Sequence, residues 1–125
     1  MAANAMHKGD VLATARVAGI QAAKQAANLL PMSHPVLIGN VYVNFTIADT
    51  HIDVEVSVDT VDRTGVEMEA LTAVTVAALT VYDMCKSIDR TMTIENVALW
   101  EKSGGRSGSW RREGAPTTVI GDVES

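Results

Sequence analysis

The chain has 125 residues, 47% of them apolar but only five aromatic, and a formal net charge of −5. This length fits a single domain over residues 1–125, and the acidic balance argues against a nonspecific nucleic-acid binder. The lone cysteine, Cys85, excludes an internal disulfide and favours a reducing, cytoplasmic location. The absence of an apolar run near residue 1 predicts no secretory signal. The longest apolar stretch, 70–82, is broken by threonines and is too short for a bilayer.

The first half of the chain predicts one helix followed by a β-hairpin. Residues 1–7 show no pattern and are expected to fray. Apolar side chains then recur at helical spacing from Asp10, a suitable N-cap, to Leu30, and Pro31 stops the helix. Apolar and polar residues alternate over 41–47 and over 52–58, with a turn at 49–51 between them. This alternation predicts two antiparallel strands with one face turned toward helices.

The second half predicts a long helix, a strand and a loose tail. Residues 63–65 break the sheet, and a helix is expected over 66–88. Its middle is apolar nearly all round, so it should be buried on several sides, one of them by a second subunit. A strand is expected over 91–100. The Gly- and Ser-rich stretch that follows predicts a mobile loop and tail over 102–125.

Two basic features could bind phosphate. Lys102, Arg106, Arg111 and Arg112 lie within eleven residues that hold no acid, next to glycines, a composition that suits anion capture but equally describes a solvated tail. Lys8 precedes the first helix, whose N-terminus favours anions. An exposed lysine before a capped helix is the simpler explanation.

Titratable side chains lie at a loop and at both ends of the long helix. His34, between two prolines, could transfer a proton or could simply be a surface histidine. Glu67 and Glu69 suit a helix start. At the other end, Asp83 and Lys86 share a helix face and form either a surface ion pair or an acid/base pair. Fourteen residues separate Glu69 from Asp83, about 21 Å of helix, so one site containing both ends needs two chains.

Metal binding has little support. The three histidines and the one cysteine make no zinc-spaced cluster. Glu67 and Glu69 could contact Mg²⁺ through substrate phosphates, although nothing requires it. There is no GxxxxGK[ST] or GxGxxG phosphate-binding motif.

Five stretches together resemble one family. They are KGDVLATARVAGIQAAK (8–24), LPMSHP (30–35), TGVEMEALTA (64–73), YDMCK (82–86) and EKSGGRSG (101–108). In this order and spacing they are similar to the cyclic pyranopterin monophosphate synthase family, the protein C family of molybdenum cofactor biosynthesis.

The resemblance implies an α+β fold, with an antiparallel, ferredoxin-like sheet, helices on one face and a homo-oligomer, a hexamer of three dimers with sites between subunits. It implies a lyase that converts 3′,8-cyclo-7,8-dihydro-GTP to cyclic pyranopterin monophosphate and pyrophosphate, with no redox step, no required cofactor, and neither nucleic acid nor membrane as partner. Asp83 and Lys86 would be catalytic, together with Lys8. The residues implied to bind substrate are Met32, Ser33, His34, Glu67, Met68, Glu69 and Lys102.

The sequence departs from the family pattern at two places. Ser33 stands where the family usually has cysteine, and only seven residues precede Lys8, where the family usually has a strand and a phosphate-contacting arginine. Both departures favour one alternative, a non-catalytic oligomeric module that binds a nucleotide or a pterin.

Overall fold

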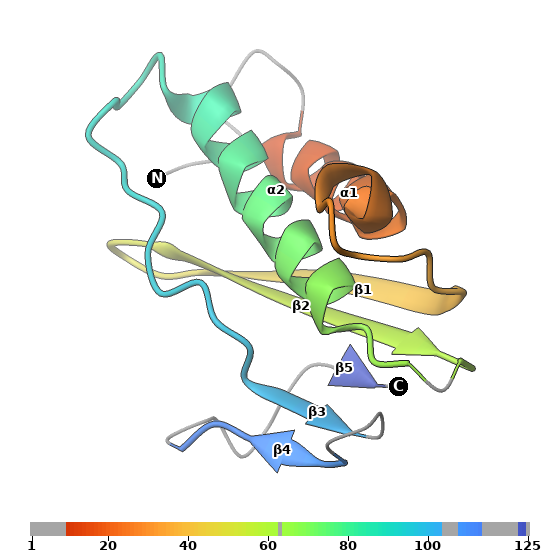
Figure 1. The fold of residues 1–125 in the computed structure, drawn as a ribbon. Coiled ribbons are helices and arrows are strands. Elements are labelled where there is room, and N and C mark those ends of the chain that lie inside the picture. Colours follow the sequence, from red (N-terminus) through yellow and green to blue (C-terminus); the bar gives the residue numbers. More distant parts are fainter. Residues whose placement is uncertain (1–9, 63, 104–107, 114–122, 125) are drawn as a thin grey trace.

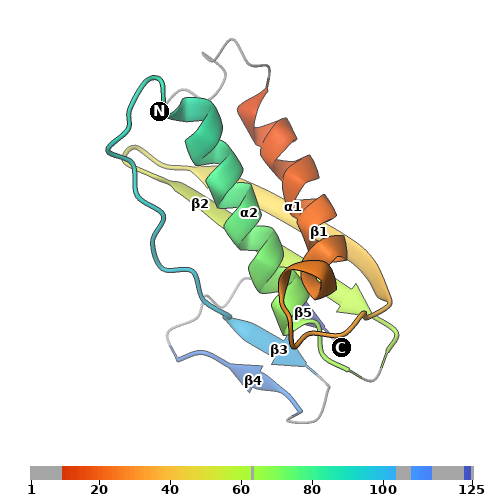
Figure 2. The same ribbon diagram turned by 45° about the horizontal axis from the view of Figure 1, so that its top comes forward.

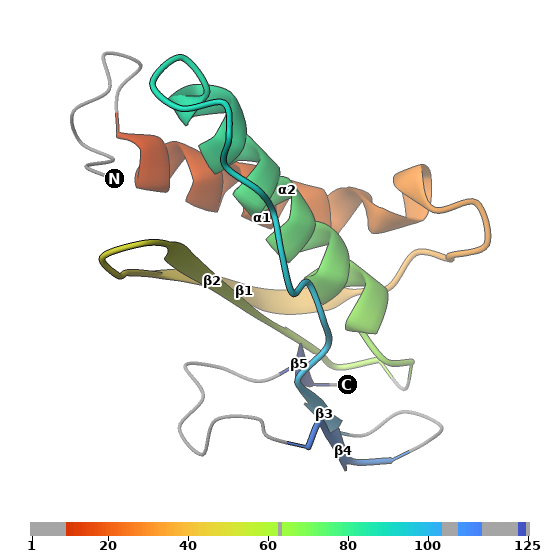
Figure 3. The ribbon, with the colours of Figure 1, turned by 90° about the vertical axis from the view of Figure 1, so that its left-hand side faces the viewer.

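The computed structural model describes residues 10–62, 64–103, 108–113 and 123–124. Two helices lie together on one face of a two-stranded sheet, and a small second sheet lies on its other side (Figures 1 and 3). This arrangement confirms the predicted α+β class. The predicted frayed start, 1–7, and Lys8 lie outside the described residues. The elements in chain order are α1 (Val11–Leu29), β1 (Ile38–Ile47), β2 (Ile52–Thr60), α2 (Glu67–Cys85), β3 (Glu101–Ser103), β4 (Trp110–Arg111) and β5 (Val123–Glu124).

Helix α1 begins as the sequence predicts. Asp10 Oδ1 accepts hydrogen bonds from the amides of Leu12 and Ala13 at 3.0 and 3.1 Å, which satisfies donors that a helix start leaves unpaired. The helix ends at Leu29, two residues before Pro31. Apart from Val11, its buried residues are alanines and one glycine, and this small-residue face lets α2 approach closely.

The two helices lie in close contact at Gly19. A Cβ at this position would lie 3.2 Å from the carbonyl oxygen of Ala73 and 3.3 Å from both Ala77 Cβ and Val43 Cγ2. The helices cross the sheet side by side (Figure 2). Packing therefore relies on short side chains brought close together, as expected of a chain with few aromatic residues.

The sheet under the helices is the predicted hairpin. Strands β1 and β2 are antiparallel, with Val43 opposite Val56 and Ile47 opposite Ile52. Both strands extend past the predicted limits of 41–47 and 52–58. Arg16 on α1 donates from Nε to the carbonyl oxygen of Val43 at 2.9 Å, and this bond ties the first helix to β1.

Helix α2 is the central element of the core. It ends at Cys85, three residues before the predicted end at Ile88. By length and composition alone it could span a membrane, but its buried face packs against α1 and β2, which explains the apolar composition. In the single chain part of its surface stays uncovered: Leu79 remains 52% exposed and Met68 is also exposed.

The predicted strand over 91–100 is wrong. This segment runs beside α2 without regular strand pairing (Figures 1 and 2). Its apolar side chains are used in packing instead, because Met92 contacts one part of the core and Leu99 another. An alternating sequence indicates which side chains are buried, but it does not supply a neighbouring strand.

The second sheet contains part of the stretch that was predicted to be a mobile tail. Its strand order is β4-β3-β5, and β3 pairs antiparallel with β4 and parallel with β5. The parallel pairing departs from the purely antiparallel sheet that was expected.

Candidate active site

The end of α2 carries the predicted acid/base pair. Lys86 Nζ donates to Asp83 Oδ1 at 2.7 Å, and both side chains are well exposed. Helical geometry places residues three apart on the same face, and Lys86 directly follows the last residue of the helix. An exposed ion pair of this kind adds little stability, so the fold does not depend on it.

The start of α2 carries a second ion pair. Lys102 Nζ, on β3, lies 3.3 Å from Glu67 Oε1, and the lysine side chain is only 10% exposed. The Glu67 carboxylate lies over Gly65, where there is no room for a Cβ. Gly65 therefore lets this carboxylate reach Lys102, a role that spacing along the sequence did not predict.

Glu69 lies one step further along α2 and is almost fully enclosed, with 4% of its surface exposed. Burial raises the pKa of its carboxyl above the ordinary value of 4.5; the charge of Glu67 also raises it, whereas its own backbone amide and His34 lower it. Glu69 also borders a pocket of ≈ 140 Å³ between the end of α1 and Pro35–Val36.

The residues of the loop after α1 differ in how far they are exposed and in what they contact near the start of α2. The backbone amide of Ser33 donates to the carbonyl oxygen of Leu30 at 3.0 Å, which shapes the loop. His34 is exposed but acts electrostatically on Glu69. Met32 is 97% exposed, so in the single chain its side chain packs against almost nothing. Met68 is also exposed and projects from the first turn of α2.

The predicted site residues thus form two separate groups. The N-terminal group consists of His34, Glu67, Glu69 and Lys102, and the C-terminal group consists of Asp83 and Lys86. Helix α2 is continuous between them, so Glu69 and Asp83 are about 21 Å apart along its axis. One chain does not bring the two groups together. The start of α1 packs at the C-terminal group's end of α2, because Val11 contacts the same core as Met84 and Cys85.

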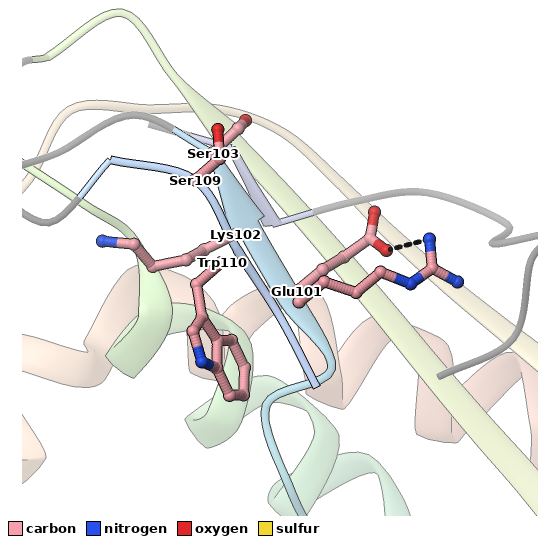
Figure 4. A pocket seen from close by; sticks show the side chains of 6 residues that line it. Glu101, Lys102, Ser103, Ser109 and Trp110 are labelled. Atoms are coloured by element: carbon pink, nitrogen blue, oxygen red, sulfur yellow. Dashed lines mark ion pairs between the residues drawn. The ribbon is translucent and has the colours of Figure 1, made fainter. Parts of the chain in front are cut away.

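A pocket of ≈ 390 Å³ beside Lys102 was not predicted. It is lined by Glu101, Lys102, Ser103, Ser109, Trp110 and Arg111, and Glu101 Oε2 lies 3.3 Å from Arg111 Nη1 (Figure 4). The sequence identified Arg111 and Arg112 only as part of a basic stretch, whereas the family resemblance also implied that Lys102 binds substrate; Arg106 lies outside the described residues. Pairing of β3 with β4 creates the pocket.

Among the described residues, no group of three or more His, Cys, Asp or Glu side chains is placed to hold a metal ion. Glu67 is paired with Lys102, and Glu69 is buried with a raised pKa. These two carboxyls do not form a preassembled cation site.

Comparison with known proteins assigns the chain to a family. The model of the MoaC family matches residues 1–105. The chain belongs to the MoaC family. Three proteins similar to this MoaC-family chain are called cyclic pyranopterin monophosphate synthase. The one from Thermomicrobium roseum is 62% identical over 108 residues, 85% of this chain and 65% of that protein.

The other two come from the genus Roseiflexus. The protein of strain RS-1 is 58% identical over 112 residues, covering 88% of this chain and 71% of that protein. The protein of Roseiflexus castenholzii is 60% identical over 110 residues, covering 86% and 70%. The MoaC-family chain thus spans about two thirds of the length of these curated relatives.

Proposed function

We propose that this chain converts 3′,8-cyclo-7,8-dihydro-GTP to cyclic pyranopterin monophosphate with release of pyrophosphate, as a lyase of molybdenum cofactor biosynthesis in the cytoplasm. The name of its relatives supports the reaction. The observation that carries the proposal is the 2.7 Å contact between Lys86 and Asp83, because the reaction needs proton transfers and no redox step.

Each group has a part in this chemistry. The Asp83 carboxylate orients the Lys86 ammonium, which transfers protons at the reacting ring. The cations Lys86 and Lys102, together with Lys8, stabilise the charge of the departing pyrophosphate. Glu67, Glu69, His34, Met32, Met68 and Ser33 line the substrate pocket. The reaction requires no resident cofactor, and Mg²⁺ enters, if at all, with the substrate phosphates.

We place each site between two subunits of a hexamer built from three dimers. The separation of the two groups along an unbroken α2 supports this placement, because a nucleotide-sized substrate cannot span about 21 Å within one chain. The exposed apolar side chains of α2, Leu79 and Met68, supply surface for a subunit contact. In this assembly the sheet completes a ferredoxin-like arrangement.

A turnover assay with the cyclised GTP substrate tests the proposal, with cyclic pyranopterin monophosphate and pyrophosphate measured together. We expect turnover by the unaltered protein, in EDTA as well as in Mg²⁺. Lys86→Met and Asp83→Asn should each lower kcat by about 10²-fold or more, with the melting temperature nearly unchanged because the pair is exposed. Asp53→Asn, an exposed hairpin aspartate paired with His51, is the matched control and should keep full activity.

Binding of the substrate by the unaltered protein without any product would contradict the proposal. That result would favour the non-catalytic binding module, which the Ser33 substitution makes the main alternative.

A further inference from the structure

We propose that Trp110 is a substrate-binding residue that stacks on the fused ring of the purine-derived substrate, beside the phosphate-binding Lys102. This inference rests on the proposed function, since it takes the substrate of that reaction as its ligand. The chain has only two tryptophans, and this one is 43% exposed at the wall of a pocket. A large aromatic side chain left open beside a charged site is a candidate binding surface.

The register of β3 and β4 decides where the indole lies. Lys102 and Trp110 are direct partners across the antiparallel pair, as are Glu101 and Arg111. Directly opposed side chains project from the same face of a sheet, so Lys102 and Trp110 share one face. Figure 4 shows these two side chains on one side of the strands and the Glu101–Arg111 ion pair away from them.

The Lys102 side chain leads from this pocket to the rest of the substrate-binding residues. Its Nζ lies 3.3 Å from Glu67 Oε1 at the start of α2, next to the buried Glu69. When the charged groups of a nucleotide contact Lys102, its ring can therefore reach Trp110, the residue paired with Lys102 across the strands. The pocket beside them, ≈ 390 Å³ in volume, is shallow and open to solvent, so a ring can approach Trp110 from outside.

The indole is also held in place before any ligand binds. The Arg112 guanidinium lies over the Trp110 ring, 5.6 Å from its centroid. Arg112 is itself anchored, because its Nε donates to the carbonyl oxygen of Leu99 at 2.8 Å and its backbone amide to that of Trp100 at 2.7 Å. Arg112 is not among the residues that line the pocket. The cation lies over one face of the ring, which leaves the opposite face for a planar ligand to stack on.

Fluorescence tests the stacking directly. In a Trp100→Phe variant, Trp110 is the sole tryptophan, and its emission is followed during titration with GTP, with guanosine or with tripolyphosphate. We expect quenching by GTP and, more weakly, by guanosine, and none by tripolyphosphate, which has no ring. Equal responses to GTP and tripolyphosphate would show that only charge is sensed and would overturn the proposal.

Kinetics with the cyclised GTP substrate then separate binding from structure. Trp110→Leu keeps an apolar side chain but has no aromatic face, and should raise KM about 5- to 100-fold with little change in kcat. Trp110→Phe should stay within about threefold of the unaltered protein, because a smaller aromatic face still stacks. An unchanged KM for Trp110→Leu, or a change in oligomer mass in place of a change in KM, would overturn the inference.

The two proposals fail in different ways. If the unaltered protein gives no product, the proposed reaction fails, while the fluorescence titration still decides whether Trp110 meets a purine ring. If the protein turns over normally, Trp110→Leu keeps the KM of the unaltered protein, and the emission of Trp110 does not respond to GTP, only the stacking role fails.

Discussion

At the scale of single residues, the start of α2 holds two carboxyl groups in different electrostatic surroundings. Glu67 and Glu69 sit two positions apart, one paired with a nearly buried lysine and the other almost fully enclosed. Their positions in the first turn are favoured by the helix dipole, yet burial of the second carboxyl raises its pKa. Ionisable side chains whose pKa is shifted by burial are typical of binding sites.

Gly65 offers a way to displace the Glu67 carboxylate with little effect on the fold. The three atoms nearest to a methyl group at Gly65 all belong to the flexible end of Glu67, so Gly65→Ala should change the free energy of unfolding by less than about 1 kcal/mol. The displaced carboxylate no longer meets Lys102, and KM should rise about tenfold. Steady-state kinetics and urea unfolding measure the two effects.

Gly39→Ala is the matched control for this experiment. A Cβ at Gly39 collides in the same way with the carboxylate of Asp59, on the β1–β2 hairpin. It should leave KM unchanged. An unaltered KM for Gly65→Ala as well would remove Gly65 from the site.

Glu69 predicts a pH dependence of stability. Because its folded-state pKa is raised above 4.5, the unfolded chain releases this proton first, and the stabilisation present below pH 4.5 is lost as pH rises through the folded-state pKa. Glu69→Gln cannot ionise. The stability difference in favour of Glu69→Gln should therefore widen as pH rises above 4.5 and level off above the folded-state pKa.

Urea unfolding at fixed protein concentration across this pH range measures the difference. Glu95→Gln, a change at an exposed glutamate, provides the comparison. A difference for Glu69→Gln that narrows with rising pH would show that its carboxylate is stabilised, not destabilised, by the fold.

At the scale of elements, the contact between α1 and α2 sets the shape of the core. The alanine-rich faces of both helices allow a close approach, and α2 in turn covers the inner side of the hairpin. The close approach depends on Gly19 having no side chain, since backbone and short side chains of α2 and β1 lie against it.

Gly19→Val should destabilise the protein by about 1–3 kcal/mol, even though glycine inside a helix is itself unfavourable. The atoms that its Cβ would meet include the carbonyl oxygen of Ala73 and the Cβ of Ala77, which cannot move without moving α2. Ala13→Val, on the exposed side of α1, should cost less than about 1 kcal/mol. Equal losses for both variants, measured by urea unfolding, would mean that the helix contact is loose.

At the scale of the whole molecule, the division of the site residues between the two ends of α2 has a direct consequence. A single chain presents Asp83 and Lys86 at one end and the Glu67–Lys102 pair at the other. If one active site uses both groups, then each chain contributes half of two different sites.

Mixed oligomers test this division. Lys86→Met and Lys102→Met should each be inactive alone, but coexpression should restore part of the activity, because some sites take Lys86 from one chain and Lys102 from another. Coexpression of Lys86→Met with Asp83→Asn, two changes in the same group, should restore none. The purified mixture should scatter light as a multiple of the 13.3 kDa chain; a monomer, or no recovery of activity in the first mixture, would contradict sites shared between subunits.

Local pattern was enough to predict the helices and the hairpin. A helix cap, a helix-ending proline and an alternating pattern each act over a few neighbouring residues, as at Asp10, Pro31 and 41–58. A short stretch of sequence is therefore enough to recognise them. The carboxylates and lysines at the ends of α2 were found by the resemblance of whole stretches, because each residue alone has an ordinary structural explanation.

The tertiary structure decided how distant segments meet. Residues 91–100 alternate like a strand yet pack singly against the core, whereas the glycine-rich stretch after them contributes to a sheet. The burial of Glu69, the Glu101–Arg111 pair and the position of Trp110 beside Lys102 all depend on contacts across loops or between elements. Burial and strand pairing are properties of the folded arrangement, and even residues close in sequence, such as Glu101 and Arg111, meet only because β3 pairs with β4.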